Sequence, residues 1–306
     1  MLPFQLIYHP GYDLNLGEHV FPAVKYRLIH DRLVAEHFAE LDDFVAPTPV
    51  ADEDVLRVHD AGWMHRLKTG RLSEAEVLRL EIPYSREMVE GFWLATGGTI
   101  LACRNALRDG VGFNIGGGFH HAFPDHGEGF CAIHDVAIAV RALQHAGRIA
   151  KALIVDCDVH HGNGTAAIFA GDNSVLTLSL HQFHNYPAEK PPSAIDVDLA
   201  DGVEDEEYLE RLKGALGVAM SFQPDLAVYV AGADPYREDQ LGGLALTIEG
   251  LKRRDELVFE TARRGSVPVA VVLAGGYARD TRDTVTIHCN TAKAAAETPL
   301  RKNRVE

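Results

Sequence analysis

The chain of 306 residues carries a formal net charge of -15 at pH 7, and 46% of its residues are hydrophobic. This composition supplies a sizeable core, whereas the acidic balance disfavours nucleic-acid and anionic-membrane partners and attracts basic peptides or amines. Without a secretory signal, a membrane span or a C-x-x-C pair, the chain is expected in the reducing cytoplasm, with its oligomeric state left open.

The first third of the chain is predicted to hold one short strand followed by helices. Apolar residues at helical spacing, polar residues at the starts and prolines after the ends mark these segments. Ser85 begins the longest of them, with Glu87 or Met88 in its first turn. The predicted segments are a strand at 4–8 and helices at 23–41, 52–58, 61–67, 73–80 and 85–107.

A glycine-rich stretch follows a further predicted strand. Residues 113–124 read FNIGGGFHHAFP, which indicates a loop that ends in two adjacent histidines, His120 and His121. Successive glycines allow the backbone to turn sharply and to approach other groups closely. Two histidines behind such a run favour a functional site over a structural role. An irregular path is predicted as far as Cys131, followed by a helix at 133–145.

The stretch that organises the chain is 154–165, IVDCDVHHGNGT. An apolar β-branched run leads into acids and histidines and then into glycines. This pattern is typical of a buried strand that ends at the ligand-binding edge of a parallel sheet. In an extended segment Asp156, Asp158 and His160 fall on one face, and such a set of oxygen and nitrogen ligands suits Zn²⁺. The alternative interpretation is a strand end with solvated acids and a glycine-rich turn.

Strand and helix patterns alternate to the end of the chain, which predicts one domain over 1–306 with a mostly parallel sheet. Four strands end in polar or glycine-rich residues, and such strand ends meet at one edge of a parallel sheet. The predicted segments are strands at 152–155, 175–180, 226–230 and 267–273, an alternating apolar and acidic segment at 195–199, and helices at 165–169, 204–222, 246–264 and from about 279.

These motifs together resemble the zinc-dependent histone deacetylase family. The tandem histidines, Gly129-Phe130-Cys131, D-x-D-x-H-H-G-x-G-T, A-G-A-D and G-G-Y occur in the family's order over nearly the whole chain. The run HVFP at 19–22 and Asn rather than Asp at 163 are similar to the class IV branch and its bacterial relatives. The resemblance implies a three-layer α/β/α fold of the arginase/deacetylase type and hydrolysis of an acyl amide.

The resemblance also implies two metal sites. Asp158, His160 and Asp234 would bind one catalytic Zn²⁺, and a vacancy beside three protein ligands suits a catalytic zinc. A structural K⁺ is expected nearby. Its ligands would be Asp156, Ser179 and Leu180, with carbonyl groups of Asp158 and His160.

Catalytic and substrate-binding roles follow from the same resemblance. His121 would be the general base, with Asn163 facing it, and His120 would lie beside the departing amine. Asp156 would orient His120, and Tyr277 would donate its hydroxyl to the oxyanion. The positions that would contact the acylated substrate are Gly129, Phe130, Tyr186 and Gly275. The loop at 81–84 shows no match for the aspartate with which better-known members hold a peptide backbone.

The favoured hypothesis is a zinc-dependent deacylase that acts on an N-acyl lysine or another acylated amine. A binuclear manganese hydrolase of the ureohydrolase (arginase) type shares the fold, but it needs D-x-H-x-D where residues 156–160 read D-x-D-x-H. A non-catalytic protein that binds acylated amines is the third hypothesis. The number of metals per chain and turnover of an acetyl-lysine peptide distinguish them, while the acyl length and the carrier of the amine stay open.

Overall fold

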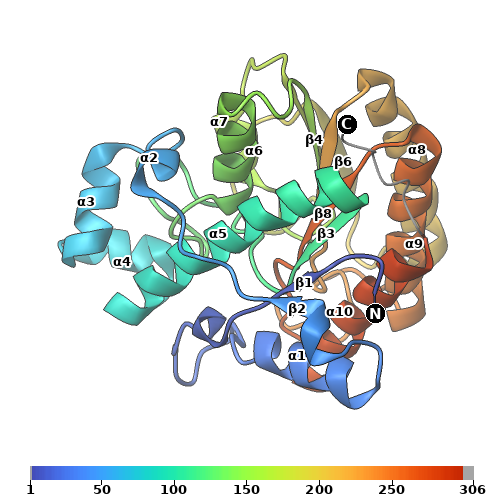
Figure 1. Ribbon diagram of the computed structural model, residues 1–306, viewed down its shortest axis with the longest axis horizontal. Helices are drawn as coiled ribbons and strands as arrows, with labels where there is room; N and C mark the ends of the chain where they lie inside the picture. The colour runs from blue at the N-terminus through green and yellow to red at the C-terminus, as the bar shows by residue number, and fades with distance from the viewer. Residues whose placement is uncertain (1, 299–306) are drawn as a thin grey trace.

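The computed structural model describes residues 2–298 and is built around one eight-stranded sheet (Figure 1). The strand order is β2-β1-β3-β8-β7-β4-β5-β6, and every neighbouring pair is parallel. The prediction of a mostly parallel sheet is thus confirmed. The strands are β1 (Leu6–Ile7), β2 (Phe44–Val45), β3 (Val111–Asn114), β4 (Ala152–Asp156), β5 (Val175–Gln182), β6 (Ile195–Leu199), β7 (Leu226–Val230) and β8 (Val269–Val272).

Helices cover both faces of this sheet, which makes the three-layer α/β/α arrangement expected from the family resemblance (Figure 1). Helices α5 and α6 pack together on one face, and α8, α9 and α10 pack on the other, with α1 against α10. The helices are α1 (Lys25–Ala35), α2 (Asp52–Val55), α3 (Ala61–Thr69), α4 (Glu74–Leu80), α5 (Arg86–Asp109), α6 (Asp135–His145), α7 (Asn163–Ile168), α8 (Asp205–Ala219), α9 (Ile248–Gly265) and α10 (Thr281–Glu297).

The central strands are apolar because helices bury them from both sides. All residues of β4, β7 and β8 are buried, as is usual for parallel strands with both faces covered. Helix starts follow the expected cap residues. The Ser85 side chain accepts a hydrogen bond from the Met88 backbone at 2.9 Å, and Ser73 forms a capping box with Glu76.

Three predictions about local structure were wrong in detail. Phe113 and Asn114 belong to β3 rather than to a loop, because their backbones pair with β1 and, at Phe113, with β8. The edge strand β2 was not predicted, since its two residues are only half-buried and carry no alternating pattern. The helix predicted at 23–41 ends at Ala35, and the backbone turns at His37, whose φ is 55°.

A fourth correction concerns the segment after β4. The strand ends at Asp156, and the chain then bends, so Asp156, Asp158 and His160 do not share one face of an extended strand. Their convergence comes from the bends and from the backbone hydrogen bonds that the two aspartates accept within this segment. Asp156 accepts from the Asp158 N–H at 3.1 Å, and Asp158 accepts from the His160 N–H at 3.0 Å.

All four cysteines are buried and free, and they are Cys103, Cys131, Cys157 and Cys289. Among residues 2–298, no helix has the length and apolar character that crossing a membrane requires.

Candidate active site

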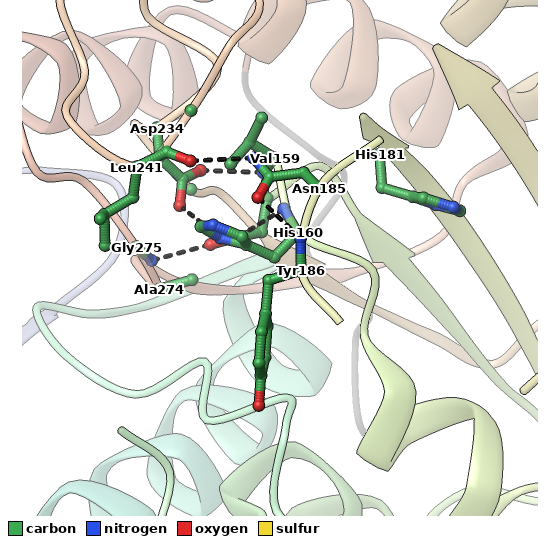
Figure 2. Close-up of polar contacts among 12 residues, drawn as sticks. Val159, His160, His181, Asn185, Tyr186, Asp234, Leu241, Ala274 and Gly275 are labelled. Atoms are coloured by element: carbon green, nitrogen blue, oxygen red, sulfur yellow. Dashed lines mark hydrogen bonds and ion pairs between the residues drawn. The ribbon is translucent and has the colours of Figure 1, made fainter. Parts of the chain in front are cut away.

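The carboxyl ends of the central strands bring three separated side chains together in the interior. Asp158 and His160 follow β4, and Asp234 follows β7, the neighbouring strand. One ligand atom from each lies within 4.8 Å of the other two, and all three residues are buried. Figure 2 shows the Asp234 carboxylate and the His160 ring facing one another. The structure therefore brings together the three residues predicted to bind zinc.

Backbone N–H groups hold the two carboxylates in place. Asp158 accepts a hydrogen bond from the Gly275 N–H at 2.9 Å, and Asp234 accepts one from the Val159 N–H at 2.9 Å (Figure 2). The second oxygen of Asp234 is buried without a hydrogen-bond partner and lies 3.3 Å from the His160 Nδ1 atom. A buried carboxylate oxygen without a partner is costly, so this atom suits a cation.

The charges of the cluster point to the same conclusion. Burial raises the pKa of Asp234 to about 7, and the nearby Asp158 carboxylate adds to the effect. Burial would lower the pKa of His160, but the adjacent Asp158 and Asp234 carboxylates outweigh it and raise the pKa to about 10. Two buried carboxylates around one imidazole thus favour added positive charge. One nitrogen and two oxygen donors are a set that Zn²⁺ accepts in catalytic sites.

Two glycines make room for this cluster. A Cβ atom on Gly275 would clash with the unpaired Asp234 oxygen, so a side chain there would fill the space beside the carboxylate. Gly276 has a φ of 144°, and its Cβ would lie 2.8 Å from Thr284 and 2.9 Å from Ala233. Only glycine tolerates such a backbone at this close approach. The G-G-Y motif therefore places Tyr277 next to the cluster.

His120 is oriented by an acid. Its Nδ1 atom lies 2.7 Å from an Asp156 carboxylate oxygen, and its Nε2 atom lies 3.7 Å from Asp158. Burial would lower the pKa of His120, but the two carboxylates outweigh it and raise the pKa to about 9. The predicted contact between His120 and Asp156 is thus present.

His121 is held by a two-step chain of hydrogen bonds. Asn163 donates from its Nδ2 atom to Glu128 at 2.7 Å, and its Oδ1 atom lies 2.7 Å from the His121 Nδ1 atom. Because a carboxylate only accepts, Glu128 fixes the orientation of the Asn163 amide, and the amide oxygen in turn requires a proton on His121 Nδ1. The Nε2 atom of His121 is left unprotonated, as a base requires.

The electrostatic surroundings also keep His121 neutral. Burial lowers its pKa well below the ordinary value, and His120 and His160 add to this effect. Burial would raise the pKa of Glu128, but hydrogen bonds from His126, Tyr186 and Asn163 outweigh it and lower the pKa. Glu128 is therefore an ionised acceptor behind a neutral imidazole.

Tyr277 lies on the wall of a cavity of about 200 Å³ that opens above the cluster. Its backbone N–H donates to an Asp239 carboxylate oxygen at 2.7 Å, which fixes the start of the turn that carries the ring. Burial raises the pKa of its hydroxyl well above the ordinary value. Tyr277 is therefore a proton-bearing donor at neutral pH. The cavity is lined by Glu81, His121, Gly129, Phe130, His160, Asn185, Tyr186, Leu241 and Tyr277.

Aromatic rings make a narrow entrance to this cavity. The rings of Phe130 and Tyr277 are 5.9 Å apart, and those of His121 and Tyr186 are 4.9 Å apart. A Cβ atom on Gly129 would lie 2.8 Å from His121 and 3.0 Å from Tyr186, so glycine lets both side chains approach. The predicted pair Phe130 and Tyr186 thus faces the same cavity as the histidines and Tyr277.

A wider cavity of about 720 Å³ adjoins the narrow one, and the two share Glu81 and Tyr186. Its walls contain acids at 81, 128 and 189 and the basic residues Arg79 and Lys190. The loop at 81–84, in which no rim aspartate was found from the sequence, thus contributes a glutamate to both cavities. The Glu81 carbonyl also accepts a hydrogen bond from the His19 ring at 2.9 Å.

Three of the residues predicted to bind potassium, Asp156, Ser179 and Leu180, lie beside the cluster on the neighbouring strands β4 and β5. Ser179 and Leu180 are on β5, and Ser179 pairs with Asp156 in the sheet register. The Ser179 hydroxyl lies 3.0 Å from His181 Nδ1, and Figure 2 shows the His181 ring directed away from His160 and Asp234.

Three residues that shape the site were missed from the sequence. Glu128 and Asp239 act through hydrogen bonds to Asn163 and Tyr277. Lys25 is fully buried, donates to the Ala274 carbonyl at 2.6 Å, and has a pKa that burial lowers to about 8. No local pattern marks any of them, because each bonds to a partner far away in the chain.

Comparison with known proteins gives consistent matches. Residues 19–292 match the model of the histone deacetylase domain. An uncharacterised protein from Picosynechococcus sp. is 39% identical over 96% of this chain and 99% of that protein. Histone deacetylase 2 of Arabidopsis thaliana is 33% identical over 89% of this chain and 74% of that protein.

The fold also matches solved structures. The HD domain of HDA15 superposes with a TM-score of 0.80 at 25% identity, and the match covers 95% of this chain and 90% of that one.

Proposed function

The chain belongs to the histone deacetylase family, and from this premise we propose that it is a zinc-dependent hydrolase that cleaves the amide of an N-acyl lysine or a similar acylated amine. The observation that carries the proposal is the buried cluster of Asp158, His160 and Asp234, of which His160 lines a narrow cavity. Two histidines and a tyrosine line or border the same cavity, which gives the cluster acid, base and oxyanion groups.

Asp158, His160 and Asp234 would bind the zinc ion. The unpaired Asp234 oxygen and the excess of negative charge support this assignment. When bound, Zn²⁺ supplies Lewis acidity toward the amide carbonyl and lowers the pKa of water. We also propose the potassium site at Asp156, Ser179 and Leu180, which the register of β4 and β5 places close together.

The two histidines divide the proton transfers. His121 is neutral with a free Nε2 atom, so it takes the proton of the attacking water. His120 is held in a charged form by Asp156, so it stabilises negative charge and supplies a proton to the departing amine. When the surroundings lower the pKa of one group and raise that of its neighbour, the first can act as the base and the second as the acid.

Tyr277 donates its hydroxyl to the oxygen that becomes negative as the carbonyl is attacked. The ring is fixed by packing against Phe130 and Phe21 and by the backbone bond to Asp239. A donor that is already in position needs no reorganisation during the reaction. The aromatic walls at 130 and 186 exclude water around the acyl group and its aliphatic stem.

The shape of the entrance supports an acylated amine on an extended stem. The narrow cavity of about 200 Å³ fits a small acyl group with a few methylenes, and the wider cavity, lined by both acidic and basic side chains, leaves room for a polar carrier. The four free, buried cysteines support a reducing compartment for this chemistry. The arginase-type and non-catalytic alternatives lack a comparable use for Tyr277.

Turnover of a fluorogenic acetyl-lysine peptide tests the proposal. We expect hydrolysis that a zinc-binding hydroxamate abolishes and that chelation followed by zinc restores. Acetylated polyamines and small acetamides, measured in parallel, identify the carrier. The absence of turnover on all of these substrates by the zinc-loaded protein would favour the non-catalytic alternative.

A pH profile tests the role of Asn163. In the Asn163→Asp variant a carboxylate faces His121, which favours its charged form and raises its pKa. The acidic limb of kcat/KM, where the base becomes protonated, should therefore move to higher pH by about one unit. The measurement is kcat/KM across pH for the zinc-loaded variant and the wild type.

Glu128 supplies the matched control. In Asn163→Asp alone, two carboxylates would face each other where the amide now donates to Glu128, so one of them can take up a proton. In the double variant Asn163→Asp with Glu128→Gln, the glutamine amide can donate a hydrogen bond to the new carboxylate. The acidic limb of kcat/KM should then move by the full amount. An unmoved limb in both variants, with zinc and fold intact, would show that Asn163 does not set the basicity of His121.

A further inference from the structure

A second cluster of metal-ligating side chains lies outside the catalytic cavity. His161, His181 and Asp196 each place a ligand atom within 4.8 Å of the other two. None of the three lines either cavity of the candidate active site. We propose that this cluster is a second, structural site for a divalent transition metal, with Zn²⁺ as the matching ion.

The cluster joins three separate segments of the fold. His161 is in the bend after β4, His181 is on β5, and Asp196 is on the edge strand β6. The two imidazole rings pack edge to face with centroids 4.6 Å apart, and both side chains are almost fully buried, with 0% and 1% exposed. Asp196 closes the cluster from the side of the edge strand with 28% of its side chain exposed.

Each histidine has one buried ring nitrogen without a hydrogen-bond partner, Nδ1 of His161 and Nε2 of His181, while His161 Nε2 lies 3.4 Å from the Ser193 hydroxyl. His181 directs Nδ1 to the Ser179 hydroxyl at 3.0 Å, while its buried Nε2 atom has no hydrogen-bond partner. That Nε2 atom lies 3.1 Å from a carboxylate oxygen of Asp198 but makes no hydrogen bond to it. A buried imidazole nitrogen with no partner, beside carboxylates, is suited to bind a cation.

The sheet register explains why two carboxylates face two histidines. In the pairing of β5 and β6, Asp196 stands opposite Ser179 and Asp198 stands opposite His181. Side chains two residues apart point to the same face of a strand, so both aspartates face the histidine pair. His161 Nε2 lies 3.3 Å from a carboxylate oxygen of Asp196. Each histidine therefore has a carboxylate close to its Nε2 atom, Asp196 for His161 and Asp198 for His181.

The donor chemistry selects the ion. Two imidazoles and one or two carboxylates suit Zn²⁺, whereas Mg²⁺ and Ca²⁺ prefer oxygen ligands alone. Since the histidines are buried and the ligands come from three segments, the ion would fasten the edge strand β6 to the interior of the sheet. Its role is stability, and it takes no part in hydrolysis.

The test uses the Asp234→Ala variant, in which the catalytic ligand set is broken. We expect this full-length protein to retain about one zinc per chain and the wild type about two. Adding Asp196→Asn to Asp234→Ala should reduce the content to about none. Micromolar zinc should raise the Tm of the Asp234→Ala protein by about 5 °C and leave the double variant unchanged.

Asp196→Asn keeps an amide oxygen of similar shape near His161 Nε2 and removes the negative charge of the ligand, so it separates metal binding from side-chain packing. Asp42→Asn, a change at an exposed acid elsewhere, is the matched control and should leave both readouts unchanged. Cobalt loading of the Asp234→Ala protein offers a second readout, because tetrahedral Co²⁺ gives visible bands that Asp196→Asn should remove.

Three outcomes overturn the proposal: zinc content near zero in Asp234→Ala, equal zinc content with and without Asp196→Asn, or cobalt bands that Asp196→Asn leaves in place. The result is independent of the proposed hydrolase activity, since none of the readouts involves turnover. It also separates this site from a binuclear centre of the arginase type, in which Asp234→Ala would disturb both metals together.

Discussion

Replacing Asp234 with Ala is expected to remove zinc from the catalytic cluster and to lower kcat/KM by at least about a thousandfold. That loss corresponds to roughly 4 kcal/mol of transition-state stabilisation, the size expected when a Lewis acid is lost. The reason is geometric, because Asp234 supplies one of only three donors and its unpaired oxygen faces His160. Zinc content and kinetics on an acetyl-lysine peptide measure the effect.

Asp234→Asn separates ligand loss from loss of structure. The amide oxygen can still accept from the Val159 N–H, so the bend after β4 is kept while a charged ligand is lost. In metal-free protein the raised pKa of Asp234 means that its ionised form destabilises the fold, and that cost grows as pH rises from about 4 to about 7. Metal-free Asp234→Asn should therefore melt at a higher temperature than metal-free wild type at pH 8.

One result would exclude Asp234 as a zinc ligand. Retention of catalytic zinc and of near-normal kcat/KM in a folded Asp234→Ala protein would contradict the assignment. Circular dichroism confirms folding, and the Asp196→Asn background keeps the second proposed site from contributing to the zinc count.

Replacing Tyr277 with Phe is expected to lower kcat for an acetyl-lysine substrate by about a hundredfold to a thousandfold, with a modest change in KM. An oxyanion donor acts mainly in the transition state, so its loss appears in kcat, at roughly 2.7–4 kcal/mol. The phenyl ring preserves the packing against Phe21 and Phe130, and the backbone bond to Asp239 does not depend on the side chain. Steady-state kinetics measure the effect.

Substrate reactivity is the internal control for Tyr277. A trifluoroacetyl group activates the carbonyl and needs less stabilisation of the oxyanion, so Tyr277→Phe should slow its hydrolysis less than that of the acetyl substrate. Zinc content should equal that of the wild type. Wild-type turnover of the acetyl substrate by the variant would exclude Tyr277 from the mechanism.

The sequence by itself determined the fold class and indicated where a candidate site would lie. Buried parallel strands produce continuous apolar runs, and β4, β7 and β8 were predicted from such runs. Because parallel strands end at one edge, residues that directly follow them had to lie close together. Asp158, Asp234 and Tyr277 each lie within a few residues of a strand end, and the family resemblance supplied their expected roles.

Glycine and cap residues were equally visible in the sequence because their effect is local. The glycines before Tyr277 leave space for the Asp234 carboxylate, and Ser85 satisfies the first backbone N–H groups of α5. The facing of Asn163 and His121 was expected from the family resemblance, and the structure places their side chains 2.7 Å apart.

Only the tertiary structure decided which distant groups support these residues. Glu128 orients Asn163 across 35 positions, Asp239 holds the Tyr277 backbone across 38, and Lys25 bonds to the Ala274 carbonyl across 249. No periodic pattern records such pairs, because each depends on how separate segments pack. The two-residue strand β2 was invisible for the same reason, since its pairing with β1 defines it.

The cluster of His161, His181 and Asp196 also depends on tertiary structure. Each of its residues belongs to a segment whose kind the sequence indicates, yet nothing in the sequence relates Asp196 to His161 and His181. The register between β5 and β6 sets that relation, and the bend after β4 turns His161 toward it. Local patterns determined the strands and their ends, and the pairing and packing of those strands decided which side chains meet.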